Sequence, residues 1–163
     1  MGHFSVAVFT TDNRRSLAKL LAAYDGNTVN NPNAKWDWYT IGGLWKDSLI
    51  LKGKKKGCDA AFVPDIDFEA MKRRAVAELR PFEKATKDSC LSEKAMRERH
   101  PTEQEYSERL PAFSTCAVIT PNGRWHESDT SDDLWAWDLN YYDRFIKPAL
   151  ENNWHMAIVD CHI

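Results

Sequence analysis

The chain has 163 residues, of which 43% are hydrophobic and 28% charged, and its net charge is −2. This length suits one domain with a core of ordinary size, so we expect a single domain over residues 1–163. The composition excludes a disordered chain, and the near-neutral charge excludes a strongly basic nucleic-acid coat protein. The apolar runs are far shorter than the ~20 residues of a membrane-spanning helix, so we expect a cytoplasmic protein without membrane contact.

The first half of the chain predicts a strand, a helix and two further strands. Residues 4–9 are apolar, as in a buried strand, and the leucines and tyrosine of residues 17–24 recur at helical spacing. Residues 27–33 are rich in asparagine and predict a loop. Strands are predicted over residues 36–41 and 48–51, with a glycine pair bending the chain between them.

The second half predicts two helices, a hairpin and a last strand. A helix opens at Asp65 or Asp67, and residues 83–110 carry charges of both signs, which predicts an exposed helical insertion. Residues 113–127 predict a hairpin, Ser131 opens another helix, and residues 154–161 form the last strand. This order predicts an α+β fold: a single, mainly antiparallel sheet with helices packed on one face, for which a ferredoxin-like arrangement is the first expectation.

The segment from residue 31 to residue 45 is rich in aromatic side chains and ends near a glycine pair. If residues 36–41 form a regular strand, Trp36 and Trp38 share one face, opposite Asp37. Indoles stack on nucleobases, and paired glycines let the backbone approach a phosphate. The alternative is that the aromatic side chains fill a core beneath a glycine turn. The candidate ligand-binding residues are Lys35, Trp36, Trp38, Tyr39, Gly42, Gly43 and Trp45.

This segment resembles a signature, NPN-x-KWDWY-x-IGG-R-W, of a family of small bacteriophage and prophage proteins without an assigned activity. The opening Phe4-Ser5-Val6 and the closing Asp160-Cys161-His162 also resemble that family, whereas residues 52–110 do not. The resemblance implies a phage-encoded accessory protein that acts in the host cytoplasm, for example against antiviral defence. The family's arginine after the glycine pair is Leu44 here, so an anion contact of that arginine would need another cation.

Asp160 and His162 lie two residues apart on the last predicted strand and therefore share a face. An aspartate can orient an imidazole as a general base or as a metal ligand. With Asp37, these residues are the candidates for catalysis, and a structural role is the alternative. The sequence holds no zinc-site spacing, phosphate-binding loop or serine elbow, so no metal or cofactor is expected, and whether the chain is an enzyme stays open.

Two functions of different classes compete, and the third alternative is a structural α+β domain without a small-molecule pocket. In the first, the chain binds a small nucleotide ligand and either sequesters or cleaves it. In the second, the acidic stretch 127–143, which contains Trp135 and Trp137, mimics nucleic acid and inhibits a host defence nuclease. The alternative for this stretch is a solvated loop and a helix N-terminus, where acidic residues are favourable. The four cysteines have no paired spacing and predict free thiols, with Cys116 and Cys161 buried.

Overall fold

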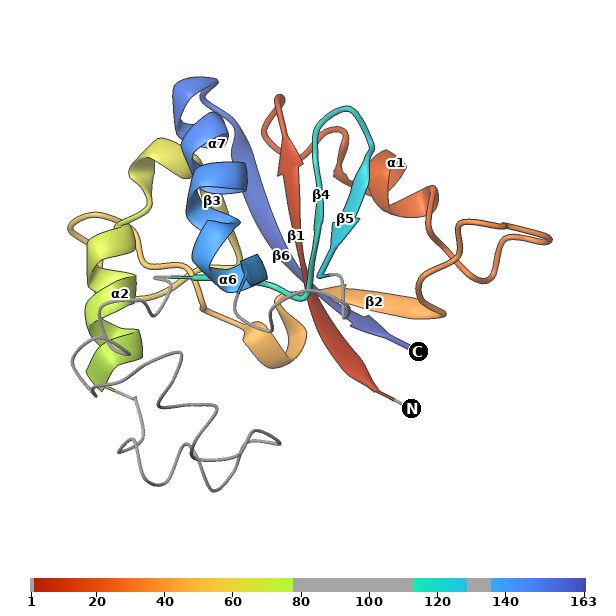
Figure 1. Cartoon of the computed structure of the whole chain (residues 1–163), viewed down its shortest axis with the longest axis horizontal. Coiled ribbons are helices and arrows are strands. Elements are labelled where there is room, and N and C mark those ends of the chain that lie inside the picture. The colour runs from red at the N-terminus through yellow and green to blue at the C-terminus, as the bar shows by residue number, and fades with distance from the viewer. Residues whose placement is uncertain (1, 78–112, 129–135) are drawn as a thin grey trace.

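The computed structural model describes residues 2–77, 113–128 and 136–163. The predicted insertion 83–110 and the helix start at Ser131 lie outside these residues. Within the described part, one six-stranded sheet has the order β2-β6-β1-β4-β5, and β3 also pairs with β6 (Figure 1). The strands are β1 (His3–Thr10), β2 (Trp38–Ile41), β3 (Ala60–Phe62), β4 (Ala117–Ile119), β5 (Trp125–Glu127) and β6 (His155–His162).

Four α-helices, two 3-10 turns and one π-helical turn complete the described part. The helices are α1 (Leu17–Ala22), α2 (Phe68–Ala77), α6 (Ala136–Tyr141) and α7 (Lys147–Glu151). A π-helical turn, η3 (Tyr142–Ile146), joins α6 to α7, and the 3-10 turns are η1 (Gly43–Trp45) and η2 (Val63–Asp65). None of the helices within these described ranges is both long and apolar enough to cross a membrane.

The centre of the sheet is the antiparallel pair of β1 and β6, which runs in register from His3 opposite His162 to Thr10 opposite His155. The strands β2 and β3 pair with successive parts of the free edge of β6, both antiparallel. The predicted α+β class and the mainly antiparallel sheet are therefore confirmed. The parallel pairing of β1 with β4 differs from a ferredoxin-like arrangement, in which neighbouring strands are antiparallel throughout.

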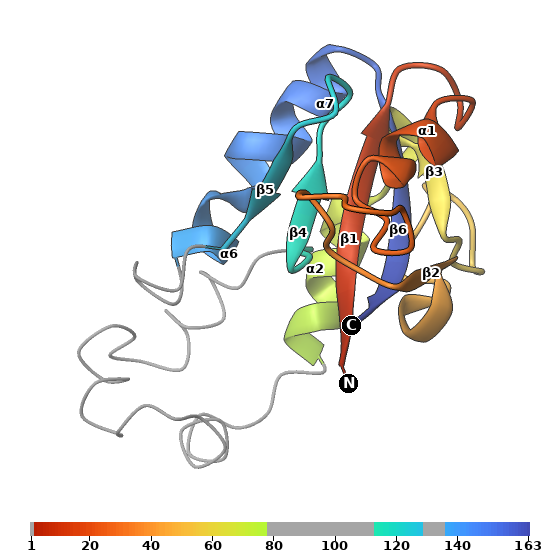
Figure 2. The same cartoon turned by 90° about the vertical axis from the view of Figure 1, so that its right-hand side faces the viewer.

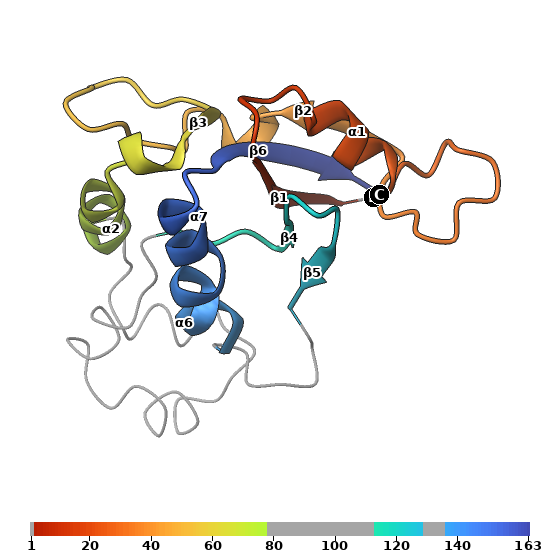
Figure 3. The same cartoon turned by 90° about the horizontal axis from the view of Figure 1, so that it is seen from above.

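Both faces of the sheet are covered, because both sets of alternate residues in β1 are apolar. Ala7 and Phe9 belong to a core cluster with residues of α2, α6 and α7. Val6 and Val8 belong to a second cluster on the opposite face, with Leu17 of α1. Seen from above, α1 lies on the other side of the sheet from α7 and α6 (Figure 3). The helices thus occupy both faces instead of the single face expected.

The connection between β2 and α2 differs most from the expectation. Residues 48–51 form no strand: Leu49 and Leu51 make isolated bridges to Cys58 and Ile66. The short β3 was not predicted, because three residues are too few to show an alternating pattern. The two ends of the described chain meet, since Gly2 and Ile163 exchange backbone hydrogen bonds of 2.9 and 3.1 Å (Figure 2).

Candidate functional site

Two histidines lie side by side at the end of the sheet where the chain termini meet. His3 of β1 and His162 of β6 are directly opposite each other, and their ring centroids are 5.1 Å apart. Each ring contacts a carboxylate through its Nδ1 atom. His3 lies 2.8 Å from Oδ1 of Asp160, and His162 lies 2.9 Å from Oδ1 of Asp37. All three predicted catalytic candidates therefore meet here, joined by His3, and we call these four residues the histidine–aspartate cluster.

The carboxylates determine which nitrogen of each imidazole carries the proton. A carboxylate only accepts hydrogen bonds, so Nδ1 of each ring carries the proton and Nε2 of the neutral ring keeps its lone pair. Each ring can therefore accept a proton at Nε2, or donate one when it is protonated. The hydrogen bond from His162 is the main cause that lowers the pKa of Asp37. The cluster thus holds two general acid–base groups in adjoining positions.

Asp160 is buried, with 3% of its surface exposed, and the turn η1 packs over its carboxylate. Its Oδ2 accepts a hydrogen bond from the backbone N–H of Leu44 at 3.0 Å. A Cβ on Gly43 would lie 2.3 Å from that oxygen, and Gly43 has φ of +53°, so only glycine allows this approach. The Gly43 backbone therefore packs against an aspartate of the chain itself, and this packing fixes the carboxylate that orients His3.

Gly42 packs in the same way against a second carboxylate, that of Asp59. Its φ is +78°, and a Cβ there would lie 2.6 Å from the carboxyl carbon of Asp59. The N–H of Gly42 donates to the carbonyl oxygen of Ile158 at 2.8 Å. This N–H, which was predicted to contact a phosphate, is thus already engaged in joining the turn to β6.

Trp38 is the one predicted stacking residue that lies at the cluster. Its ring stacks on His162 with a centroid distance of 4.9 Å and an interplanar angle of 15°. It also meets the ring of His3 edge to face at 5.5 Å. Trp38 keeps 45% of its surface exposed. An indole with an accessible surface therefore lies beside both imidazoles.

The other predicted aromatic residues do not join Trp38. Trp36 is 2% exposed and packs with Tyr24 and Trp125 in the core on the opposite face of the sheet. It does not share a face with Trp38, because β2 begins only at Trp38 and Trp36 makes an isolated bridge to Asp25. Tyr39 points to the same side as Trp36 and contacts its ring at 6.3 Å.

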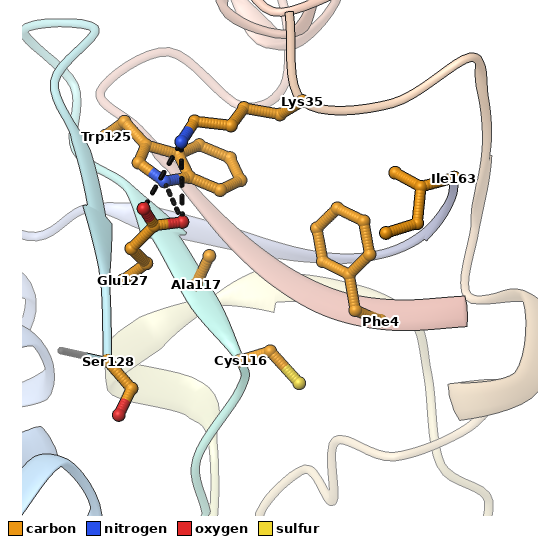
Figure 4. Close-up of a pocket in the computed structure, with 8 residues that line it drawn as sticks. All are labelled: Phe4, Lys35, Cys116, Ala117, Trp125, Glu127, Ser128 and Ile163. Atoms are coloured by element: carbon orange, nitrogen blue, oxygen red, sulfur yellow. Dashed lines mark hydrogen bonds and ion pairs between the residues drawn. The ribbon is translucent and has the colours of Figure 1, made fainter. Parts of the chain in front are cut away.

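Trp45 packs against the core cluster beneath α2, α6 and α7. Lys35 lies away from the histidines and makes a 3.2 Å ion pair with Glu127. Lys35 also lines a cavity of about 380 Å³ (Figure 4). This cavity lies on the sheet face opposite the histidine–aspartate cluster, because Phe4, which also lines it, follows His3 on β1. The predicted ligand-binding residues therefore divide among the cluster, the two cores and this cavity.

His3 is the member of the site that sequence reasoning did not select. Its role depends on the pairing of the first strand with the last, which places it opposite His162. The signal in the sequence was a histidine at the edge of a predicted strand, and it becomes informative only once that pairing and its register are known.

The acidic stretch of the competing hypothesis is only partly described. Asp129, Asp132, Asp133 and Trp135 lie outside the described residues. The indole of Trp137 packs onto the core, and its Nε1 donates to the carbonyl oxygen of Thr115 at 2.7 Å. Across the described ranges, no three residues among His, Cys, Asp and Glu are grouped as a metal site requires.

Comparison with known proteins gives no match: no protein-family model, no curated protein and no solved structure matches this chain. The functional conclusion therefore depends on the chemistry of the histidine–aspartate cluster and its neighbour Trp38.

Proposed function

We propose that the chain binds a small nucleotide against Trp38 and cleaves its phosphodiester bond with His3 and His162. The observation that supports this proposal is the cross-strand pair of imidazoles, each bonded through Nδ1 to its own carboxylate. A pair of oriented imidazoles can act as base and acid in one displacement, which a purely structural role does not require.

The binding step uses the exposed part of the Trp38 ring. Stacking of a nucleobase on an aromatic side chain contributes about 1–3 kcal/mol. The phosphate then lies towards the imidazoles, where a protonated ring supplies the positive charge and the hydrogen bond. Lys35 does not take this role in our proposal, because it pairs with Glu127 on the other face of the sheet.

The chemical step needs no group beyond water and the two rings. One neutral imidazole accepts the proton of a water molecule at Nε2 while the water oxygen attacks phosphorus. The other imidazole, protonated, donates its proton to the leaving oxygen as the P–O bond breaks. Asp37 and Asp160 act as positioning residues, because they hold the tautomer and orientation of the rings. The resemblance implies a phage setting, and the residue types imply the nucleotide; together they extend this proposal to the removal of a nucleotide signal of host defence.

A panel of cyclic and linear purine nucleotides tests the proposal. Tryptophan fluorescence measures binding, and chromatography of the nucleotide after incubation measures cleavage. At least one member should quench the emission, and Trp38→Ala should abolish this response. Tyr39→Ala is the matched control, since Tyr39 lies on the same strand with its side chain on the opposite face, and binding should persist.

His3→Asn and His162→Asn should each weaken binding only partly, because stacking on Trp38 remains, and should lower the cleavage rate of the bound nucleotide by roughly 10²–10⁴-fold, the usual contribution of a general acid or base. Binding of an intact nucleotide that is never cleaved would reject the catalytic step and leave sequestration. A folded protein that responds to no member of the panel would reject the nucleotide.

A further inference from the structure

The cavity beside β4 and β5 is separate from the histidine–aspartate cluster. Its wall includes Phe4, which follows His3 on β1 and therefore points to the opposite face of the sheet. Ala117 and Trp125 belong to β4 and β5, and Ile163 closes the side near the chain end (Figure 4). The volume of about 380 Å³ is within the range of small-molecule sites in proteins.

The two charged groups that line the cavity, Lys35 and Glu127, neutralise each other. Nζ of Lys35 lies 3.2 Å from Oε1 of Glu127, and Nε1 of Trp125 donates to Oε2 of Glu127 at 2.9 Å. The hydrogen bond from Trp125 is the main cause that lowers the pKa of Glu127, and Lys35 adds to it. The carboxylate is thus ionised at neutral pH, and an anionic ligand would have to compete with it for Lys35.

The apolar walls suit a flat ring. Phe4 and Trp125 lie apart, on opposite sides of the cavity, and the small side chain of Ala117 lies below Trp125 in the view of Figure 4. Lys35 lies over the ring of Trp125, with Nζ 5.2 Å from its centroid. A ligand ring between Phe4 and Trp125 would therefore meet a donor and an acceptor, Lys35 and Glu127, at one edge.

We propose that this cavity binds a small, uncharged heteroaromatic molecule, with its ring between Phe4 and Trp125 and its polar edge against Lys35 and Glu127. A donor and an acceptor on adjacent ring atoms bond to Glu127 and to Lys35 without breaking their ion pair. This site is independent of the proposed nucleotide chemistry, since it uses other residues on the other face of the sheet.

Saturation-transfer NMR with three bicyclic probes tests the proposal. Quinazolin-4-one is uncharged and carries both a donor and an acceptor, naphthalene has neither, and naphthalene-2-sulfonate is an anion. We expect quinazolin-4-one to bind at least tenfold more tightly than the sulfonate. Phe4→Leu should weaken its binding several-fold, whereas Ile41→Ala, a half-exposed residue outside the cavity, should not. Equal binding of the sulfonate and quinazolin-4-one would overturn the proposal.

A charge substitution gives the sharper result. Glu127→Gln removes the charge opposite Lys35 and should increase the affinity for naphthalene-2-sulfonate by about tenfold or more. Glu151→Gln, an exposed acid on α7, changes the net charge equally and should leave the affinity as it was. An unchanged sulfonate affinity in Glu127→Gln would contradict the assigned role of the ion pair.

The alkylation rate of Cys116 shows whether the probe occupies this cavity. This thiol was expected to be buried, but it is exposed and lines the cavity, because it precedes β4 at the end of the sheet. Saturating quinazolin-4-one should slow the alkylation of Cys116 by iodoacetamide and leave that of Cys58 unchanged, as followed by mass spectrometry of the peptides. Equal slowing at both cysteines, or at neither, would place the probe elsewhere and reject this cavity.

Discussion

The backbone N–H of Leu44 donates a 3.0 Å hydrogen bond to the buried carboxylate of Asp160, while the side chain of Leu44 is 70% exposed. The contact that holds the cluster is therefore independent of the side chain at this position. This is the position at which the resembling signature has an arginine, so an arginine here would extend into solvent from the turn that contacts Asp160, the carboxylate bonded to His3.

The first prediction follows from this geometry. Leu44→Arg should strengthen the binding of the quenching nucleotide by roughly 2- to 5-fold at low salt, since an exposed charge pair contributes about 0.5–1 kcal/mol. The gain should disappear as salt is added. Leu44→Gln is the uncharged control, and fluorescence titration at two salt concentrations is the measurement. An arginine variant that binds no better than the glutamine variant at low salt would count against an anionic ligand at the cluster.

The second prediction compares two glycines, Gly43 and Gly53, to separate the cost of a positive φ from the cost of a clash with Asp160. Gly43 and Gly53 both have positive φ, +53° and +69°, but a Cβ on Gly53 meets nothing within 4 Å. Gly53→Ala should therefore lower the free energy of unfolding by only about 1 kcal/mol, the cost of the left-handed conformation. Gly43→Ala should cost clearly more and should also disturb the bond between Asp160 and His3.

Urea unfolding of the two variants side by side measures this difference. Equal losses of stability would show that the close approach of Gly43 to Asp160 adds no constraint of its own.

The third prediction concerns the pH dependence of stability. Burial is the main cause that lowers the pKa of His126, and the charges of Arg144 and Arg124 lower it further. The folded state therefore binds this proton less readily than the unfolded state, whose histidine titrates near pH 6.5. Stability should fall as the pH decreases through this value, because the unfolded chain gains the proton first.

His126→Gln removes the titrating group. The loss of unfolding free energy between pH 7.5 and pH 5.5 should be smaller in this variant than in the parent chain, as measured by urea titrations at both pH values. The same loss in both proteins would assign the pH dependence to other groups.

The fourth prediction concerns the buried hydroxyl of Tyr141. It lies 2.7 Å from Oγ1 of Thr115, and burial raises the pKa of Tyr141 far above its ordinary value. Tyr141→Phe should lower the free energy of unfolding by about 1 kcal/mol, the usual net value of one such hydrogen bond. Tyr142→Phe is the adjacent control, and its half-exposed ring should change stability by less than about 0.5 kcal/mol. A loss of the same size in both variants would remove the hydrogen bond to Thr115 as the cause.

The elements that sequence patterns predict well here are those with long periodic signals. The strand at residues 4–9 and the last strand appear close to their expected limits as β1 and β6, and the helical face that begins at Leu17 appears as α1. Of the two helix starts that the sequence left open, Asp65 and Asp67, the structure shows the cap at Asp67, whose Oδ1 accepts a hydrogen bond from the N–H of Ala70 at 2.9 Å. Local spacing determines these features, so one sequence suffices to find them.

The site is predictable only in part, because its geometry depends on non-local pairing. The interest in Asp37, Asp160 and His162 came from residue type and spacing, but the pairing of His162 with Asp37, and of Asp160 with His3, depends on strand register. The shared face assigned to Trp36 and Trp38 was wrong, since it assumed a regular strand from residue 36 onwards. A loop that ends two residues later than expected is enough to move one indole into the core.

The central pairing of β1 with β6 also has a consequence for how the chain acquires its fold. His3 and Asp160 are 157 positions apart. The ribosome therefore synthesises β6, the main partner of β1, long after β1. Contacts of such long range make folding slow, because loop closure costs entropy before any pairing is gained. During synthesis the apolar residues of β1 emerge before either of their partner strands, β4 and β6, and β6 is the later of the two. We therefore expect newly made chains to depend on chaperones that shield this strand until β6 has left the ribosome.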